Sequence, residues 1–374
     1  MNIPTRLYPA GLGLALCLCG MISIHGGLTL LYLSITAIGY SAQEVLAIFL
    51  SGCLAVLLIP LVGVPCERVV QVAMTIKILL GAYALLAGSV LIVPEALCSG
   101  LIASSSFYFA MREISRVNNG KWAASILILI INVESLLLYS ALGWLSESVS
   151  RSWLTLAYCA AIVLPLLYIS QSVSIAPYQR ASLRQILAAA KGLSAFNVLC
   201  YMLAVFSVNC FNVSIHRWAE LNTAYWWGSV SGMTCFYIVG VLVSVGILSS
   251  LKIDENKLLM AGMMGISLLG FGLYNVGTEA SPSMPAIVVL LGVMSTVVMS
   301  SIAASLARTN TTLSRLLVVG VLAALQVSLI IVIRVAKVFS ESVVNEWQAI
   351  AMLGGALALV NVHRQYFKHW IWRT

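Results

Sequence analysis

Twelve apolar segments run along this chain of 374 residues and constrain its fold more than any other feature. Short polar breaks separate them, and most are long enough to cross a bilayer as a helix of roughly 20 residues. Helices of this length satisfy their own backbone hydrogen bonds inside lipid. The predicted spans cover residues 9–33, 43–65, 69–93, 96–111, 122–145, 153–170, 193–212, 223–250, 258–277, 284–306, 316–337 and 348–362.

The composition excludes most soluble classes of protein. Hydrophobic residues make up 61% of the chain and charged residues only 9%, whereas soluble domains carry about 25% charged residues. A water-soluble enzyme, a nucleic-acid-binding module and a disordered chain are all incompatible with these values. No segment is polar enough to form a separate soluble domain, so the membrane helices must carry the function.

The positions of the basic residues predict the topology. If the N-terminus lies in the cytoplasm, fifteen of the twenty Lys and Arg residues fall in cytoplasmic segments and three in outer loops. This asymmetry follows the positive-inside rule and supports twelve spans with both termini cytoplasmic. The net charge of +8 then reflects topology and contact with anionic lipids, so no nucleic-acid partner is expected.

The longest cytoplasmic connection divides the predicted helices into two sets of six. It covers residues 171–192 and has the pattern of a short amphipathic linker. The sequence therefore predicts an N-terminal six-helix half at 1–170 and a C-terminal six-helix half at 193–374, related as pseudo-repeats. Sequence similarity between the halves is faint: Ser51-Gly52 recurs as Ser231-Gly232, a match that chance alone can produce.

The loop after the second span contains a recognisable spacing. It reads Gly63-Val-Pro-Cys-Glu67-Arg68-Val-Val-Gln, and together with the six-plus-six topology it resembles the major facilitator superfamily of secondary transporters. Val70 and Gln71 stand where that family has a second glycine and a basic residue. The resemblance implies a cytoplasmic gate latch at Gly63, Glu67 and Arg68. The alternative is a tight helix connection with an ordinary cytoplasmic arginine.

The same resemblance implies a function. The two halves would alternate in opening a central cavity to either side of the membrane, and so move a small polar or amphiphilic solute. We expect coupling to protons, lean to export over import, and expect a monomer in a bacterial inner membrane. The fifth span, 122–145, has one glycine and no proline, which disfavours a typical multidrug antiporter.

Two other classes remain open. A non-transport scaffold or sensor on a degenerate facilitator fold fits the incomplete loop pattern. An integral membrane enzyme is disfavoured, because no catalytic cluster, phosphate-binding loop or zinc spacing occurs in the sequence. We therefore expect no enzymatic activity, no cofactor and no metal site.

Ionisable residues inside the spans are the candidates for ion coupling, since such groups are costly in lipid and usually face an interior cavity. Glu134 lies near the middle of the fifth span and is the predicted proton-coupling residue, with His25 of the first span as a second candidate. Lys77 in the third span is expected to be structural, with its ammonium reaching towards the cytoplasmic surface.

Polar residues mark the predicted cavity. In the family fold, spans 1, 4, 7 and 10 line the cavity, and spans 4, 7 and 10 of this chain are rich in hydroxyl and amide groups. Packing between helices is the alternative role for such residues. The substrate-cavity candidates are Arg334, Asn197, Tyr201, Asn209, Gln326 and Tyr108.

Overall fold

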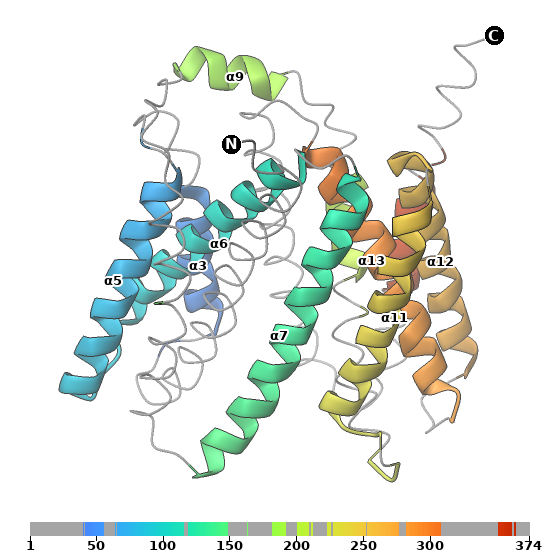
Figure 1. Cartoon of the computed structure of the whole chain (residues 1–374), viewed down its shortest axis with the longest axis horizontal. Helices are drawn as coiled ribbons and strands as arrows, with labels where there is room; N and C mark the ends of the chain where they lie inside the picture. Colours follow the sequence, from blue (N-terminus) through green and yellow to red (C-terminus); the bar gives the residue numbers. More distant parts are fainter. Residues whose placement is uncertain are drawn as a thin grey trace, which may run out of the picture. The chain divides into compact units, whose positions relative to one another are not determined.

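The structure is a computed structural model, and all regular structure in its described residues is helical (Figure 1). This confirms the predicted all-α class. The number of twelve spans and the side of the termini are not tested by the described part of the chain. The structure describes residues 40, 42–55, 64, 66–115, 119–148, 163, 182–191, 200–208, 211, 223–225, 227–251, 253–276, 282–307, 351–360 and 363.

Eight helices have defined bounds, and the apolar character of the longest ones suits a bilayer. They are α3 (Ala42–Ala55), α5 (Cys66–Ala87), α6 (Ile92–Ser115), α7 (Gly120–Ser148), α9 (Leu183–Lys191), α11 (Val230–Ser250), α12 (Glu255–Val276) and α13 (Met284–Ala307). Within the described residues, three segments are both long and apolar enough to cross a membrane: Arg68–Ala87, Ser231–Ser250 and Met284–Ala307.

Large apolar side chains on the outside of these helices support a membrane location. Leu86 of α5 is 90% exposed, and Leu268 of α12 is 70% exposed. Side chains of this kind are stable against lipid tails and unfavourable in water. The chain is therefore an integral membrane protein that crosses the bilayer more than once.

The helix bounds correct the predicted spans at two places. The short span 96–111 is a helix of 24 residues, α6, that begins at Ile92, so Glu95 lies in its first turn instead of an outer loop. Helix α11 begins at Val230 instead of residue 223, and Ser229 caps it by accepting a hydrogen bond from the Gly232 amide at 3.0 Å. The predicted linker, residues 171–192, contains the short helix α9.

The chain forms two compact units. Unit 1 comprises Met1–Asn118, Val133–Leu193 and Leu306–Ala323, and unit 2 comprises Asn119–Asn132, Ser194–Ser305 and Ala324–Thr374. In unit 1, α6 packs against both α3 and α5. Helices α11 and α12 and all but the last two residues of α13 belong to unit 2, and α7 begins in unit 2 and continues in unit 1. The division into two six-helix halves stays a prediction.

Two helices of unit 1 match helices of unit 2 in length, and glycines recur at the same helix positions in two pairs of helices. Helices α5 and α12 both have 22 residues, and α6 and α13 both have 24. Gly52 is the eleventh residue of α3 and Gly240 the eleventh of α11, while Gly100 and Gly292 are each the ninth residue of their helices. The repeated Ser51-Gly52 and Ser231-Gly232 pairs are not equivalent, because Gly232 lies at the start of α11.

The matched glycines make the same contact in unit 1 and in unit 2. In unit 1, a Cβ on Gly52 would overlap the carbonyl oxygen of Leu97, and a Cβ on Gly100 would overlap that of Phe49. Each carbonyl lies three residues before the partner glycine. Glycine is thus required by the close approach of α3 and α6, as expected for small residues at membrane helix contacts.

Unit 2 repeats this geometry between α11 and α13. A Cβ on Gly240 would overlap the Val289 carbonyl oxygen, and one on Gly292 would overlap that of Tyr237. Again each carbonyl lies three residues before the partner glycine. The same glycine contact therefore recurs, with the same spacing and helix register, between α3 and α6 and between α11 and α13.

Candidate functional site

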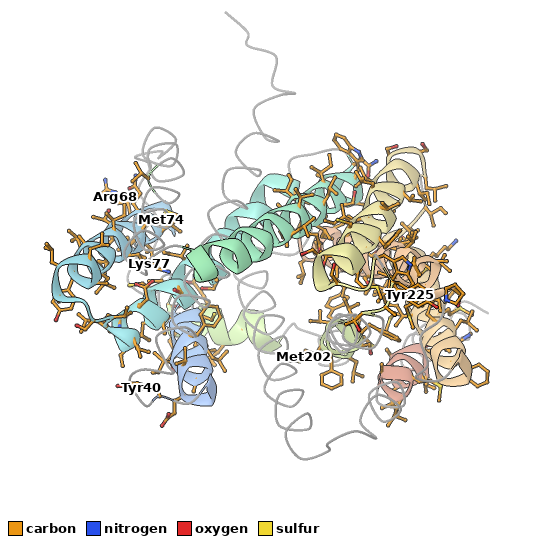
Figure 2. The ribbon with its side chains drawn as sticks, turned by 90° about the horizontal axis from the view of Figure 1, so that it is seen from below. Tyr40, Arg68, Met74, Lys77, Met202 and Tyr225 are labelled. Carbon is orange, nitrogen blue, oxygen red and sulfur yellow. The ribbon has the colours of Figure 1, made fainter. Side chains whose placement is uncertain are left out.

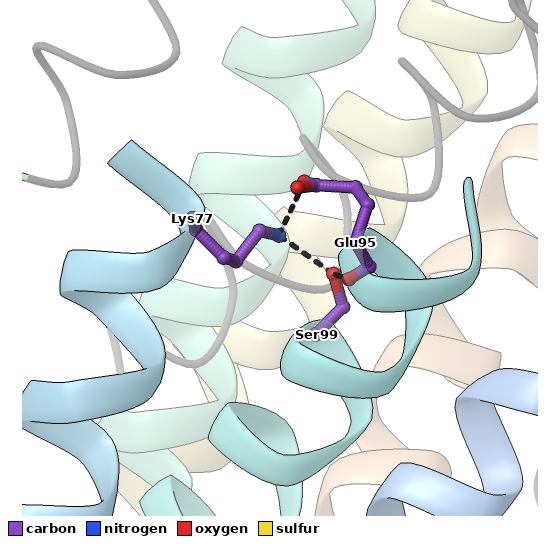
Figure 3. A network of polar contacts seen from close by, with 3 residues as sticks. All are labelled: Lys77, Glu95 and Ser99. Atoms are coloured by element: carbon purple, nitrogen blue, oxygen red, sulfur yellow. Dashed lines mark hydrogen bonds and ion pairs between the residues drawn. The ribbon is translucent and has the colours of Figure 1, made fainter. Parts of the chain in front are cut away.

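A buried charge cluster joins α5 to α6 in unit 1 (Figure 3). The Lys77 ammonium lies 3.0 Å from Glu95 Oε1 and donates a hydrogen bond of 2.6 Å to the Ser99 hydroxyl. Lys77 and Ser99 are fully buried and Glu95 is 6% exposed. Lys77, Glu95 and Ser99 are called the charge cluster below.

Each side chain of the charge cluster is positioned by its helix. Lys77 lies in the middle of α5, beyond the buried Ala73 and Met74. Glu95 lies in the first turn of α6, where the positive end of the helix dipole favours a carboxylate. Ser99 lies one turn further on and donates to the Glu95 carbonyl oxygen at 2.8 Å, so its oxygen can accept from Lys77.

This geometry corrects the sequence interpretation of Lys77. Its ammonium was expected to reach towards the cytoplasmic surface, but it is fully buried and paired with Glu95. Arg68, at the start of the same helix, differs from Lys77 because it is exposed. Figure 2 labels both residues on α5. A single unpaired charge inside a membrane is costly. If Lys77 is buried, it is therefore more stable when paired and hydrogen-bonded to an opposite charge than when left alone.

A second polar cluster lies in unit 2, where α7 begins. Asn119 caps α7, since its side-chain oxygen accepts from the Trp122 amide at 3.2 Å, and its Nδ2 donates to the Leu248 carbonyl at 3.2 Å. The Lys121 ammonium donates to the Ile253 carbonyl oxygen. Asn119 and Lys121 therefore hold the start of α7 against the end of α11 and the connection that follows it. Cations are favourable at helix C-terminal ends.

Replacing Asn119 by alanine should lower the free energy of unfolding by about 1–2 kcal/mol, because one substitution removes a helix cap and an interhelical hydrogen bond. The check is thermal or denaturant unfolding of the purified protein in detergent. Asn256→Ala on the exposed start of α12 is the matched control and should change stability by less than about 0.5 kcal/mol. Equal losses in both variants would show that Asn119 contributes nothing specific.

Hydroxyl groups gather on α13 and the helical residues 200–208 in unit 2. The Tyr201 hydroxyl lies 2.6 Å from the Ser305 hydroxyl. Thr296, Ser300 and Ser301 are buried and bond to carbonyls of their own helix. Ser295 is buried with no hydrogen-bond partner for its hydroxyl among the described residues. An unsatisfied buried hydroxyl is costly, so this region suits a polar ligand or a water molecule.

The structure describes only some of the predicted site residues. Tyr201 is buried at its contact with Ser305, which agrees with a place inside unit 2. Glu134 and Tyr108 lie within α7 and α6, and Glu67 lies in the first turn of α5, but their side chains are outside the described part. The predicted residues that fall wholly outside it are His25, Arg334, Asn197, Asn209, Gln326 and Gly63.

Two members of the charge cluster were missed in the sequence. Glu95 falls between the predicted spans 69–93 and 96–111, next to Pro94, although proline is common in the first turn of a helix. Had the helix start been placed at Ile92, Glu95 and Ser99 would have been recognised as neighbours on one helix face, four residues apart. Their pairing with Lys77 depends on tertiary packing and has no signal in the sequence.

Comparison with known proteins identifies the fold. No protein-family model matches the chain, and no curated protein matches its sequence. Solved structures do match. The E. coli fucose:proton symporter FucP superimposes with a TM-score of 0.71 at 12% identity, covering 96% of this chain and 98% of that one. The chain has the major facilitator superfamily fold.

Two further structures agree over similar lengths. The human organic anion transporter MFSD10 matches with a TM-score of 0.63 at 15% identity, covering 97% of this chain and 99% of that chain. The proton:xylose symporter XylE matches with a TM-score of 0.63 at 14% identity, covering 96% and 94%. At these identities the likeness establishes the facilitator fold and leaves the activity to be argued from this chain's own residues.

Proposed function

We propose that the chain is a secondary active transporter that moves a small polar or amphiphilic solute by alternating access. The observation that carries this proposal is the facilitator fold along nearly the whole chain, with 96% covered by FucP. The buried charge cluster in unit 1 and the hydroxyl-rich region in unit 2 add polar groups of the kind that transport pathways use. No enzymatic activity is proposed.

Proton coupling is the finer part of the proposal. FucP and XylE are both described as proton symporters, and Glu134 of α7 remains the first candidate for the coupling residue, with His25 the second. The cavity candidates Arg334, Asn197, Tyr201, Asn209, Gln326 and Tyr108 would contact the solute. We keep export as the proposed direction, and a monomer in a bacterial inner membrane as the proposed setting.

One observation favours a second candidate function, a scaffold or sensor that transports nothing. Val70 stands where the gate-latch pattern has its second glycine, and it is fully buried within α5. Arg68, the basic partner of the proposed latch with Gly63 and Glu67, is exposed. A chain that never alternates between two open states would not need a complete latch, so transport must be measured directly.

The test uses the purified full chain in liposomes and a mixture of small metabolites extracted from cells as the probe. After a pH gradient is imposed, the lumen is analysed by mass spectrometry. Transport predicts that at least one solute is enriched or depleted in the lumen relative to protein-free liposomes. Identical lumen contents with and without protein, under gradients of both directions, would favour the scaffold.

Replacing Glu134 by glutamine should abolish gradient-driven movement of that solute, a loss of about 100-fold or more, because the amide cannot exchange a proton near neutral pH. Exchange of labelled for unlabelled solute without a gradient should continue. Both rates are measured in the same liposomes, with Glu44→Gln on the exposed start of α3 as the control. Intact gradient-driven movement in Glu134→Gln would remove Glu134 from the coupling mechanism.

A further inference from the structure

Helix α9, in the predicted linker, has an uncovered apolar side. Leu183 is 61% exposed and Leu187, one turn further on, is 55% exposed. The other described side chains of α9, those of Arg184, Gln185 and Ala188, are exposed as well. Leucine side chains are more stable when they are removed from water, so the apolar side of α9 is suited to contact with another apolar surface.

The stability of α9 also depends on such a contact. The helix has nine residues, and helices shorter than about 12 residues are marginal in water when nothing packs against them. A capping box supports its start: the Ser182 amide donates to Gln185 Oε1 at 2.8 Å, and the Gln185 amide donates to the Ser182 hydroxyl at 3.3 Å. These bonds favour the helix but bury no apolar area, so a surface that covers the leucines would stabilise it further.

The helix period separates an apolar arc from a basic edge. Residues of an α-helix follow one another at about 100° around its axis, so positions i, i+3, i+4 and i+7 share one side. In α9 these positions are all apolar: Leu183, Ile186, Leu187 and Ala190. Arg184 and Lys191 are seven residues apart and fall together beside one edge of the arc. This pattern is typical of helices that lie in the plane of a membrane surface.

The charges around α9 have one sign. The linker at 171–192 carries Arg180, Arg184 and Lys191 and no acidic residue, and the sequence has no Asp or Glu between Glu147 and Glu220. A segment of this kind is complementary to anionic lipid headgroups, which attract basic residues that lie next to a membrane.

The chain itself keeps α9 close to the bilayer. Lys191, the last residue of α9, lies two residues before the predicted span at 193–212. Two residues reach at most about 7 Å, so the end of α9 lies within reach of the headgroups that surround that span. A groove on a partner protein would also cover the leucines, but the bilayer is always adjacent and matches the basic edge.

We propose that α9 docks on the anionic lipid surface of the membrane that the chain spans. Leu183 and Leu187 enter the boundary between headgroups and acyl chains, and Arg184 beside them contacts the anionic headgroups. The proposal concerns a lipid-binding surface outside the transport pathway, and it does not depend on whether the chain transports a solute.

The test is hydrogen exchange of the α9 backbone amides, measured by mass spectrometry on the purified full chain in nanodiscs that hold one copy each. Exchange should be slower by about tenfold or more when one third of the phosphatidylcholine is replaced by phosphatidylglycerol, because three basic residues then gain an attractive surface. Salt at about 1 M should remove most of this difference. Equal exchange in the two bilayers would overturn the proposal: α9 would be held by the chain itself if both rates were slow, and undocked if both were fast.

Three variants divide the effect between the leucines and the arginine. Leu183→Gln/Leu187→Gln keeps the helix propensity but removes the apolar side, and it should exchange fast in both bilayers. Arg184→Gln should lower the protection given by phosphatidylglycerol by about fivefold. Ala188→Gln, on the exposed side away from the apolar arc, is the control and should behave as wild type.

Exchange of the α5 and α12 amides, read in the same spectra, reports whether each variant is folded and should not change. Lipid-dependent protection that persisted in Leu183→Gln/Leu187→Gln would contradict the docked orientation. If all variants behaved as wild type, neither the apolar side nor Arg184 would contact lipid, and the proposal would be wrong.

Discussion

Replacing Gly100 by alanine is expected to destabilise the protein by about 3 kcal/mol, at the upper end of what overpacking costs. The added Cβ would overlap the Phe49 carbonyl oxygen and lie 2.8 Å from the Cys53 amide nitrogen. Both obstacles are backbone atoms, so no side chain can rotate away, and α3 and α6 must separate. The unfolding midpoint in detergent and the yield of monodisperse protein measure the effect.

The repeat supplies a matched variant and a control. Gly292→Ala should cause a loss of similar size in unit 2, because its Cβ would overlap the Tyr237 carbonyl oxygen. Gly246 lies in α11, and a Cβ added there would meet nothing within 4 Å among the described residues. Gly246→Ala should therefore be neutral or stabilising by up to about 1 kcal/mol. If Gly100→Ala were as stable as Gly246→Ala, the close contact between α3 and α6 would be wrong.

The second large effect concerns the charge cluster. Replacing Glu95 alone by alanine should cost about 3–5 kcal/mol, because it leaves the buried Lys77 ammonium without a counter-charge. Replacing Lys77 alone by isoleucine should be costly for the converse reason. Unfolding of the single variants and of the Lys77→Ile/Glu95→Ile pair, measured in detergent, forms a double-mutant cycle.

The pair should recover most of the loss caused by either single change. The coupling energy from the cycle should be about 2 kcal/mol or more, at the high end for residues in direct contact. Additive losses would show that Lys77 and Glu95 do not depend on each other, and would contradict the 3.0 Å contact between them.

Apolar runs and charge asymmetry predicted the helical class, because both follow from the bilayer acting as a solvent. The lengths of the helices were predicted less well where a proline or a polar residue interrupts the apolar pattern. Pro94 and Glu95 at the start of α6 are such a place. Tertiary packing overrides the local pattern there: Glu95 is acceptable inside α6 only because Lys77 from another helix neutralises it.

The internal repeat was also only partly visible in the sequence. The number and size of the predicted spans suggested a duplication, and the recurring Ser-Gly pair, which chance can produce, does not occupy equivalent helix positions. Gly52 and Gly240 make the same contact at the same helix position, and their neighbours differ because only the glycine itself is constrained by the carbonyl that it contacts. Equivalent positions in a repeat can therefore be recognised from helix register when sequence identity is too low.

The most direct test of the transport claim compares the small metabolites of cells and medium with and without expression of the full chain. Gly246→Ala, which should fold and act as wild type does, is expressed alongside as a control for the substitution procedure. The account predicts that at least one solute changes compartment when wild type or Gly246→Ala is present, and that an uncoupler of the proton gradient abolishes the change. Unaltered metabolite distributions across varied growth conditions, with the chain present in the membrane, would contradict transport and leave the scaffold as the function.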